Sequence, residues 1–347
     1  MAVAPFLEAA FGRPSPHIPV WFMRQAGRSL PEYRALRGDG SILDAIKRPD
    51  LAAELTLQPV RRYGVDAAVL FSDIVVPAHA VGFGIDVAPG TGPMCAQPLR
   101  TAADLARLRP FDADADAPYV GETVRQLARE LPAAVPLLAF AGAPFTVASY
   151  LIEGRPSKTY MHTKRMMHTD PQLWHAVMER LVQHAVESIS SQLRSGAGAF
   201  QLFDSWAGAL SAADYQSLVL PHSTAVFSAL RAMFPDAPGI HFGVGCDHLL
   251  EHMNDAGPAI LGLDWRTPIA QARSRMGADL VVQGNLDPAL VLAGADTALA
   301  GTRVVLADNL NPNGGRHPGH IFNLGHGVQP EADPDVLAAI VDLVHQA

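Results

Sequence analysis

Short apolar runs of strand length recur along the chain, and longer amphipathic segments separate them. The runs are mostly continuous rather than alternating, which is typical of strands buried on both faces of a parallel sheet. The eight predicted strands are Ile18–Met23, Ala67–Phe71, Val135–Ala141, Ala199–Phe203, Gly239–Phe242, Ala259–Leu263, Asp279–Val282 and Ile321–Leu324.

Helical patterns fill the segments between these runs. In the three clearest helices a proline beside an aspartate stands at the start, where proline suits the first helical position. These helices are Pro49–Tyr63, Pro171–Leu193 and Pro334–Leu343. Eight strands that alternate with helices predict an α/β fold, a (β/α)₈ TIM-type barrel that forms a single domain over residues 1–347. An open sheet of six or seven strands stays as the alternative, because short apolar runs are easily miscounted.

Two segments interrupt the alternation and are predicted to be insertions. Pro77–Pro98 is rich in glycine and leaves the barrel after the second strand. Asn309–Gly319 reads as a loop immediately before the last strand. No linker divides the chain into separate domains.

Composition limits the classes of function. With 49% hydrophobic and 17% charged residues, the 347-residue chain has a globular balance. The net charge of −8 disfavours general binding to nucleic acid or to an anionic membrane. Two cysteines, Cys95 and Cys246, exclude a disulfide scaffold and fit a reducing compartment. No secretory pattern opens the chain, and the uncharged stretch Leu131–Ile152 holds three prolines, so we expect a cytoplasmic protein.

Polar residues follow most of the predicted strands. In a parallel barrel the strands end at one face, and chemistry is built there. The segments at these ends are Arg24–Arg28, Ser72-Asp73, Asp204-Ser205-Trp206, Asp264-Trp265, Gln283-Gly284-Asn285 and Gly325-His326-Gly327. Their placement predicts a single converging site.

The first of these loops carries an unusual excess of arginine. Four arginines, Arg24, Arg28, Arg34 and Arg37, face one acid, Glu32, in a chain that is negative overall. The guanidinium group binds carboxylate or phosphate through two parallel hydrogen bonds, so the loop is predicted to hold an anion. The alternative interpretation is a solvated first turn of a helix.

Single polar residues at the other strand ends have two interpretations each. Asp73 and Asp204 suit a catalytic acid or a helix cap. His326 lies between two glycines, where the backbone can come close to a ligand. Together with His317 and His320 it raises the question of a metal, but the spacing matches no known zinc pattern. We therefore predict no metal site there, and glycine-rich phosphate loops are missing.

Several blocks of residues resemble one family. PVWFMRQAGRSLPEYR (residues 19–34) and GHIFNLGHGV (residues 319–328) are highly specific for uroporphyrinogen decarboxylases of the haem pathway. The intervening blocks FSDIVVP, FAGAPFTVASYLIEG, QLFDSWAG and QGNLDP are similar to those of the family and occur in the same order. Ser29 stands where many members have tyrosine.

The resemblance implies a (β/α)₈ barrel, a homodimer and a reaction that needs no metal or organic cofactor. It implies removal of carboxyl groups from the four acetate arms of uroporphyrinogen III, which gives coproporphyrinogen III. The residues that match the substrate-binding positions of the family are Arg24, Gln25, Ala26, Gly27, Arg28, Arg37, Asp73, Tyr150, Ser205 and His326. Of these, Asp73, Arg24 and Arg28 are the expected catalytic residues.

Two other functions remain as alternatives. Zinc-dependent, corrinoid-linked methyltransferases of the same superfamily use a His-x-Cys motif after a barrel strand, whereas this chain has His241-Phe242-Gly243. A non-enzymatic tetrapyrrole carrier would keep the arginines and would not need Asp73. The proton donor also stays open between an arginine, a protonated His326 and a carboxyl group of the substrate.

Overall fold

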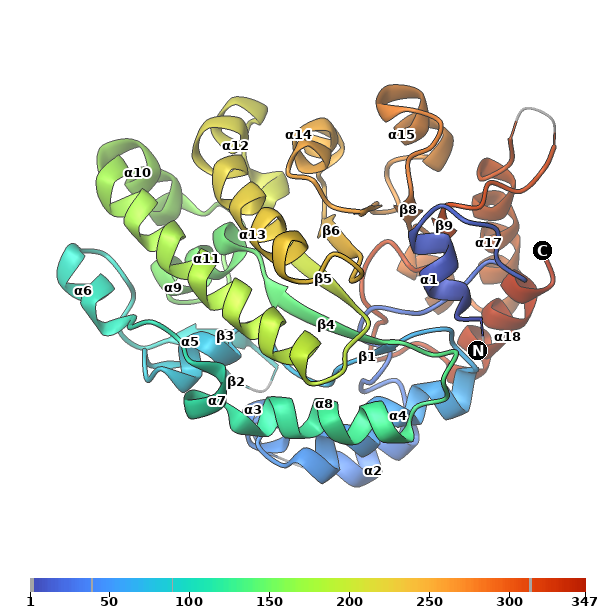
Figure 1. Ribbon diagram of the computed structural model, residues 1–347, viewed down its shortest axis with the longest axis horizontal. Helices are drawn as coiled ribbons and strands as arrows, with labels where there is room; N and C mark the ends of the chain where they lie inside the picture. The colour runs from blue at the N-terminus through green and yellow to red at the C-terminus, as the bar shows by residue number, and fades with distance from the viewer. Residues whose placement is uncertain (1–2, 39, 89, 312–313) are drawn as a thin grey trace.

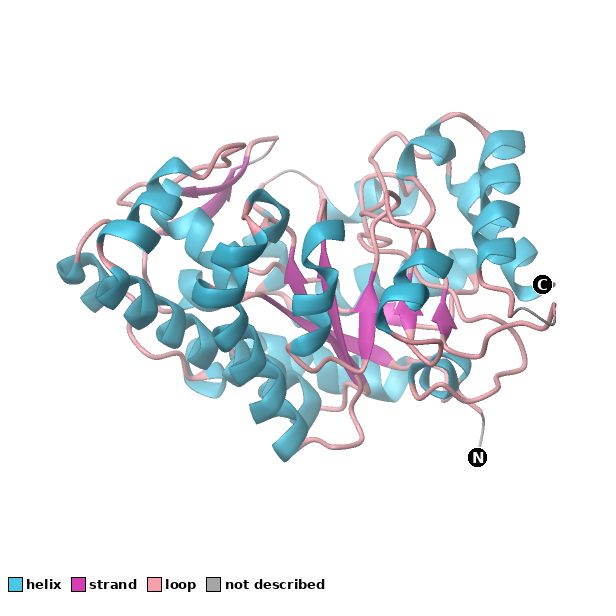
Figure 2. Cartoon of the chain, turned by 90° about the horizontal axis from the view of Figure 1, so that it is seen from above, coloured by secondary structure: helices cyan, strands magenta, loops and turns pink. Residues whose placement is uncertain are grey.

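The computed structural model describes residues 3–38, 40–88, 90–311 and 314–347. Its centre is a curled, parallel, seven-stranded sheet in the order β1-β4-β5-β6-β7-β8-β9. The strands are β1 (Ala68–Val69), β4 (Leu137–Gly142), β5 (Ala199–Asp204), β6 (Gly239–Gly243), β7 (Ile260–Gly262), β8 (Val282–Gln283) and β9 (His320–Ile321). Figure 2 shows these strands gathered in the middle of the molecule with helices around them.

Helices connect successive strands and cover the outside of the sheet (Figure 1). The α-helices are α1 (Pro5–Ala10), α2 (Pro31–Arg37), α3 (Ile42–Ile46), α4 (Pro49–Tyr63), α5 (Val76–Ala80), α6 (Ala102–Arg107), α7 (Ala113–Asp116), α8 (Pro118–Glu130), α9 (Pro144–Glu153), α10 (Met161–Thr169), α11 (Pro171–Arg194), α12 (Ala212–Leu218), α13 (Leu220–Met233), α14 (Leu250–Asp255), α15 (Ile269–Met276), α16 (Pro288–Leu292), α17 (Ala295–Asp308) and α18 (Pro334–His345). Short 3₁₀ turns, η1 (Ala207–Ala209) and η2 (Asp247–Leu249), follow β5 and β6. The helices predicted from the Asp-Pro pairs are confirmed as α4, α11 and α18 to within two residues.

The first predicted strand, Ile18–Met23, is wrong as a regular strand. Val20 forms one isolated parallel bridge to Phe322, next to β9. Its backbone carbonyl accepts a hydrogen bond from the N–H of Asp66, next to β1. The segment thus lies between the two edge strands without a regular ladder to either.

Side chains explain why no ladder forms there. The N–H of Phe22 donates to Oε1 of Gln25, and the N–H of Met23 donates to Oδ1 of Asn323. These donors are therefore satisfied by amide side chains rather than by a neighbouring strand, which an apolar pattern cannot predict. The short strands β8 and β9 are likewise shifted from their predicted ranges.

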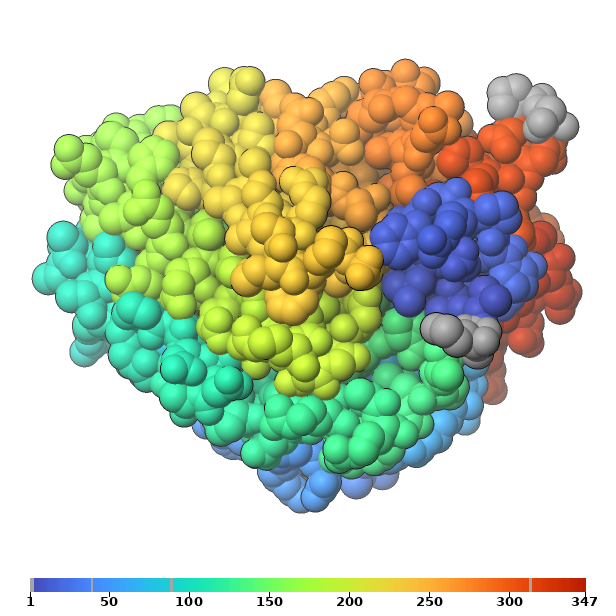
Figure 3. Space-filling model, in the orientation of Figure 1, coloured from blue at the N-terminus to red at the C-terminus, as the bar shows by residue number. Residues whose placement is uncertain are grey.

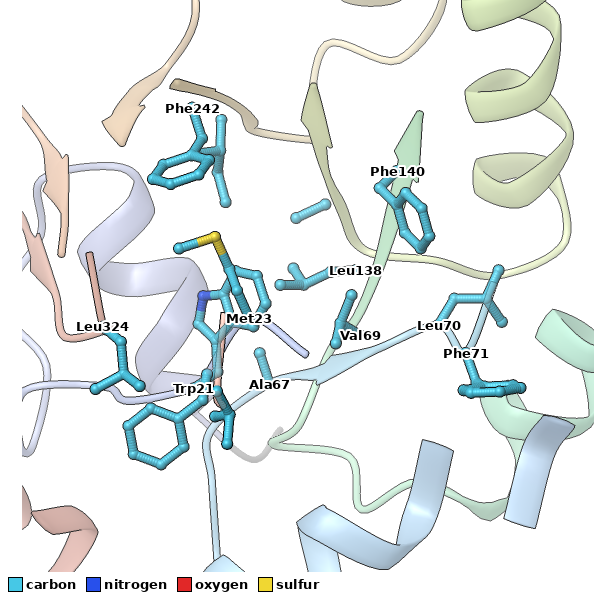
Figure 4. Close-up of a cluster of buried hydrophobic side chains, with 14 of the residues drawn as sticks. Trp21, Met23, Ala67, Val69, Leu70, Phe71, Leu138, Phe140, Phe242 and Leu324 are labelled. Atoms are coloured by element: carbon cyan, nitrogen blue, oxygen red, sulfur yellow. The ribbon is translucent and has the colours of Figure 1, made fainter. Parts of the chain in front are cut away.

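Buried amides cross the inside of the curled sheet. The indole N–H of Trp21 donates to Gln283 on β8 (2.9 Å), and the amide of Gln283 donates to Gln201 on β5 (2.8 Å). Figure 4 shows Trp21 and Met23 among buried apolar side chains from β1, β4 and β6. The hydrogen-bonded chain ties the first segment to the interior, where an unpaired amide would be costly.

The predicted excursion Pro77–Pro98 is confirmed as an addition to the sheet. It contains α5 and an antiparallel hairpin of β2 (Ile85–Ala88) and β3 (Gly92–Cys95), apart from residue 89, which lies outside the described residues. The loop Asn309–Gly319 has an antiparallel bridge between Leu310 and Arg316, and its residues 312–313 are likewise outside. Within the described ranges, no helix is both long and apolar enough to cross a membrane; the apolar stretch after residue 131 is divided between β4 and α9.

Candidate active site

Predicted site residues from five segments lie at the carboxyl edge of the sheet. Asp73 follows β1, Tyr150 lies on α9 directly after β4, and Ser205 follows β5. His326 comes shortly after β9, and the loop from Arg24 follows the Val20 segment. Parallel strands end at one edge of a sheet, and this brings together residues that are up to about three hundred positions apart in the sequence.

Arg24 stands at the centre of this group. Its backbone has a φ of 60°, a left-handed conformation that is uncommon for a residue with a side chain and is frequent at functional sites. A Cβ at Gly327 would come within 2.5 Å of Cδ of Arg24, so the arginine stem lies against the glycine backbone. A Cβ at Gly27 would lie 2.9 Å from the Arg24 carbonyl. The two glycines thus make room for Arg24.

Asp73 is a carboxylate with little compensation. Within the described chain, its side chain accepts one hydrogen bond, from the N–H of Val75 (3.0 Å). This bond is the one expected if Asp73 caps the following turn, which was one of its two interpretations. Burial raises the pKa of Asp73 above its ordinary value, while this hydrogen bond and the charge of Arg24 act in the opposite direction. The half-buried carboxylate of Asp73 is therefore only weakly compensated by the protein.

Tyr150 faces the same pair of charges. Burial raises its pKa, the carboxylate of Asp73 raises it further, and Arg24 opposes both. Its ring packs edge to face on Trp206, with the ring centroids 6.0 Å apart. The ring of Tyr160 packs on the same indole at a tilt of 37°, also with 6.0 Å between the centroids. An aromatic wall of Tyr150, Trp206 and Tyr160 thus stands beside Asp73.

His326 is neutral at ordinary pH. Burial and the nearby positive charge of Arg24 lower its pKa to about 4. Its Nδ1 accepts a hydrogen bond from the N–H of Gly327 at 2.6 Å. In the neutral ring the proton then sits on Nε2, which makes Nε2 a hydrogen-bond donor. The neighbouring Gly325 is tightly packed against the backbone of Trp265, so the glycines beside His326 accommodate protein groups.

Arg28 and Arg37 lie near Tyr33 rather than near His326. The charges of Arg37 and Arg28 both lower the pKa of Tyr33, against a larger rise due to burial. Tyr33 packs edge to face on Phe71, two residues before Asp73. The guanidinium group of Arg28 has no hydrogen-bond partner among the described residues, whereas Arg37 donates to the carbonyls of Gly38 and Gly40.

The side chain of Gln25 does not point into the candidate site with the other predicted residues. It is fully buried, its Oε1 accepts from the N–H of Phe22, and its Nε2 donates to the carbonyl of Ala67 at 3.1 Å. These bonds order the loop that carries Arg24 and Arg28, so Gln25 acts on the site through the backbone. Ala26, Gly27 and Ser205 are half-buried at the same edge.

The three histidines near the last strand do not converge on a metal. His320 is buried and bonds to the carbonyl of Gly284, and His317 accepts the N–H of Gly319. In the part of the chain that the structure describes, one group of three side chains has its possible ligand atoms within 4.8 Å of one another. This group lies elsewhere and consists of His17, Asp66 and His345.

The methyltransferase zinc motif does not fit either. A Cβ at Gly243 would meet Sγ of Cys246 at 2.5 Å, so a cysteine side chain has no room at that position. His241 is fully buried, and its Nδ1 bonds to the carbonyl of Met253. Nε2 of His241 lies 3.7 Å from Oδ2 of Asp204, in a packed interior.

Asp204, which the sequence predicts to be either a catalytic acid or a helix cap, has a structural role. Its Oδ1 accepts from the hydroxyl of Thr146 at 3.0 Å, and this hydroxyl accepts from the N–H of Trp206 at 3.3 Å. Asp204 therefore fixes the beginning of α9 relative to the Trp206 loop. Tyr160 was not predicted, since nothing in its own segment connects it to Tyr150.

A small pocket borders the site on one side. It is lined by Asp73, Phe140, Phe111 and Gln192, between β4 and the outer helices, and it does not include Arg24, Tyr150 or His326. The convergence of charged groups, and not this pocket, therefore marks the candidate site.

Comparisons with known proteins agree with the blocks found in the sequence. Residues 2–347 match the family model described as Uroporphyrinogen decarboxylase (URO-D). The chain is 54% identical over 345 residues to a uroporphyrinogen decarboxylase of Salinispora tropica, covering 99% of this chain and 91% of that protein. It is 52% identical over 342 residues to the one of Streptomyces coelicolor, covering 98% and 93%.

A solved structure has the same fold. A methyltransferase from Methanosarcina mazei superposes with a TM-score of 0.78 at 18% identity, covering 99% of this chain and 97% of that chain. At this identity the likeness concerns the fold alone. On the family match and these identities, the chain belongs to the uroporphyrinogen decarboxylase family.

Proposed function

We propose that this chain is a carboxy-lyase that converts the four acetate side chains of uroporphyrinogen III to methyl groups and so yields coproporphyrinogen III. Membership of the family supports decarboxylation in porphyrin biosynthesis. The observation that carries the proposal is the half-buried carboxylate of Asp73, which accepts one hydrogen bond within the described chain and lies near Arg24 at the carboxyl edge of the sheet.

The chemistry requires an electron sink, which the substrate itself supplies. A proton adds to a ring carbon of the electron-rich pyrrole and makes the ring cationic. The carbon–carbon bond to the carboxylate then breaks, carbon dioxide leaves, and its electron pair neutralises the ring. A second proton adds to the exposed methylene carbon as the ring proton is lost, so each arm consumes one proton in total. No step needs a metal or an organic cofactor.

Asp73 suits the charge that develops. Its weakly compensated oxygens accept hydrogen bonds from pyrrole N–H groups and stabilise the ring cation, an interaction that strengthens toward the transition state. The guanidinium groups of Arg24 and Arg28 have no hydrogen-bond partner among the described residues, and they bind carboxylates of the substrate. Arg37, which donates to the carbonyls of Gly38 and Gly40, binds a further carboxylate. Tyr150 and Ser205 line the same edge.

His326 has a defined part in this proposal. With its pKa lowered to about 4, the ring is neutral at pH 7 and is not the resting source of the ring proton. Its Nε2–H donates a hydrogen bond to the substrate instead, because Nδ1 is already occupied by the N–H of Gly327. The ring proton then comes from an arginine or from a carboxyl group of the substrate.

We further propose that the fold is a closed (β/α)₈ barrel and that residues 1–347 form one domain. The bridge from Val20 to Phe322 and the bond from Asp66 to Val20 support closure at the eighth position. The main apolar core, which extends from Phe6 to Val344, supports a single domain. A homodimer, a cytoplasmic location and the lack of nucleic-acid or membrane partners are proposals that rest on the family and on the negative charge.

The direct test is incubation of the purified chain with chemically reduced uroporphyrin, followed by chromatographic counting of the product carboxyls. We expect a product with four carboxyls fewer than the substrate. A folded protein that binds the substrate and leaves every carboxyl in place would instead support a tetrapyrrole carrier. Methyl transfer from a corrinoid without decarboxylation would support the methyltransferase alternative.

A further inference from the structure

A second cluster of polar side chains lies at the opposite, amino-terminal edge of the sheet. It joins His17, in the segment before Val20, Asp66, just before β1, and His345, the last residue of α18. Nε2 of His17 lies 2.7 Å from Oδ1 of Asp66, and Nε2 of His345 lies 2.8 Å from Oδ2. In Figures 1 and 3 the blue N-terminal and red C-terminal segments lie side by side.

The carboxylate of Asp66 is held in place independently of the two histidines. Its Oδ2 accepts a hydrogen bond from the N–H of Val20 at 2.8 Å, and its own N–H donates to the carbonyl of Val20 at 2.8 Å. Its side chain is 8% exposed. The cluster therefore has a rigid oxygen ligand that does not need to be reorganised.

The two imidazole rings are close together and accessible. Their centroids are 4.1 Å apart with a 45° tilt between the planes. The side chains of His17 and His345 are 25% and 27% exposed. The two rings are therefore partly open to solvent, so the cluster is not sealed inside the protein.

The distances and the ligand types fit one class of ion. The three candidate ligand atoms all lie within 4.8 Å of one another. A tetrahedral zinc ion with bonds of about 2.0–2.2 Å separates its ligands by about 3.3 Å. The two rings contact different oxygens of Asp66, at 2.7 and 2.8 Å, so the ring on the oxygen that binds the ion needs to move away by only about 0.5 Å, and the other ring turns toward that oxygen. Two imidazoles and one carboxylate suit Zn²⁺, whereas Mg²⁺ and Ca²⁺ prefer ligand sets of oxygen.

We propose that His17, Asp66 and His345 form a binding site for one divalent transition-metal ion of the zinc type, with water as the fourth ligand. On binding, each nitrogen–metal bond replaces a hydrogen bond to Asp66. A neutral ring moves its proton from Nε2 to Nδ1, and a protonated ring releases one proton to solvent. The metal loses bound water molecules in exchange.

The bound ion links three parts of the chain that are far apart in sequence. It connects the segment before Val20, the start of β1 and the end of α18, at the edge away from Arg24 and Asp73. Residues at this end of a parallel barrel contribute to stability rather than to chemistry. The site is therefore a stabilising clamp that takes no part in decarboxylation, and it does not depend on the proposed function.

Calorimetric titration of the full chain, after dialysis against a chelator, tests the site with ZnCl₂ alone. We expect saturation near one zinc ion per chain, a rise in Tm of at least ~2 °C with excess zinc, and no comparable effect of MgCl₂. His17→Gln and His345→Gln, on two different elements, should each weaken zinc binding by at least ~10-fold. Decarboxylation by His345→Gln should stay unchanged.

The matched control is His168→Gln, because His168 is an exposed histidine that faces a single carboxylate, Asp214, at 3.6 Å. This variant should bind zinc like the unmodified chain. Circular dichroism confirms that each variant is folded. Absence of saturable zinc binding at micromolar concentrations overturns the site, as does zinc binding that is the same in both cluster variants and in the unmodified chain.

Discussion

Two aspartates at opposite edges of the same sheet have contrasting surroundings. Asp66, at the amino edge, receives three hydrogen bonds, from His17, from His345 and from the N–H of Val20. Asp73, at the carboxyl edge, receives one in the described chain, from the N–H of Val75, and burial raises its pKa. The two residues are seven positions apart and flank the same short strand, β1.

The contrast separates a stabilising carboxylate from a reactive one. A fully hydrogen-bonded carboxylate lowers the free energy of the folded state, and losing an acceptor leaves donors unsatisfied. A desolvated carboxylate with one bond costs stability until a complementary charge arrives. In this protein the carboxylate of Asp73, with one hydrogen bond in the described chain and the charge of Arg24 nearby, lies at the edge where the substrate is proposed to bind.

The largest expected effect is on catalysis at Asp73. Asp73→Asn keeps the size of the side chain and an acceptor for the N–H of Val75 but removes the charge. We expect turnover of reduced uroporphyrin to fall by at least ~10²-fold, since one preorganised electrostatic group is lost. Because a weakly compensated charge is also removed, the Tm at pH 7 should not decrease.

Asp73→Glu serves as the matched control for this change. It retains the charge and displaces it by one methylene, so its turnover should exceed that of the asparagine variant. An asparagine variant that turns over within a few-fold of the unmodified chain would leave Asp73 with only the capping of its own turn.

Asp66→Asn should have the opposite result. The amide offers one acceptor oxygen to three donors and places N–H hydrogens against a histidine. We expect the free energy of unfolding to fall by about 1–3 kcal/mol, measured by urea titration, with turnover per folded molecule unchanged. Unchanged stability together with lost activity would place Asp66 in the catalytic apparatus and abolish the contrast.

Loss of the arginine fork should have a smaller effect on substrate binding. Arg28→Lys and Arg37→Lys retain the charge but cannot bind a carboxylate through two parallel bonds. We expect kcat/KM to fall by about 10-fold in at least one of them. Arg62→Lys, in an exposed pair with Asp335, is the control and should be silent. Full activity in both site variants would contradict a role for these arginines.

His326→Gln should have a milder effect on turnover. Glutamine can still donate a hydrogen bond, but from a different position, so we expect a loss of about fivefold. The zinc content of the same sample, measured by elemental analysis, should not change, since His326 lies at the edge opposite to His345. A variant that loses bound zinc would favour the methyltransferase interpretation.

The smallest effect concerns acid stability. His326 has a pKa lowered to about 4 in the folded chain, below the ordinary value of 6.5, so its contribution to stability is complete above pH 6.5 and is lost as the pH falls toward 4. His326→Gln should therefore reduce the proton uptake on unfolding at pH 5 by up to one proton. Urea titrations at several pH values give the free energy of unfolding as a function of pH, and the slope of this curve gives the proton uptake. A slope that is the same in the variant and in the unmodified chain would contradict a buried neutral ring.

Local sequence determined the helices and the polar strand ends of this protein. Proline beside aspartate marks α4, α11 and α18, because this pair favours the first helical turn wherever it occurs. Seven of the eight continuous apolar runs overlap a strand of the sheet, and the polar residues that follow the eight runs include Arg24, Asp73 and His326. These signals depend only on residues that are close together in the sequence, so they can be recognised from the sequence alone.

Tertiary structure alone decided which of these polar groups act together and how. Gln25 lies in the most specific block of the sequence, yet its side chain is buried in hydrogen bonds to Phe22 and Ala67. The segment Ile18–Met23 has a strand pattern, yet the side chains of Gln25 and Asn323 accept the N–H groups of Phe22 and Met23. His17, Asp66 and His345 are separated by 49 and 279 positions and gave no signal in the sequence. Burial, hydrogen-bond saturation and the meeting of distant segments depend on the whole fold, and they distinguish Asp73 from Asp66.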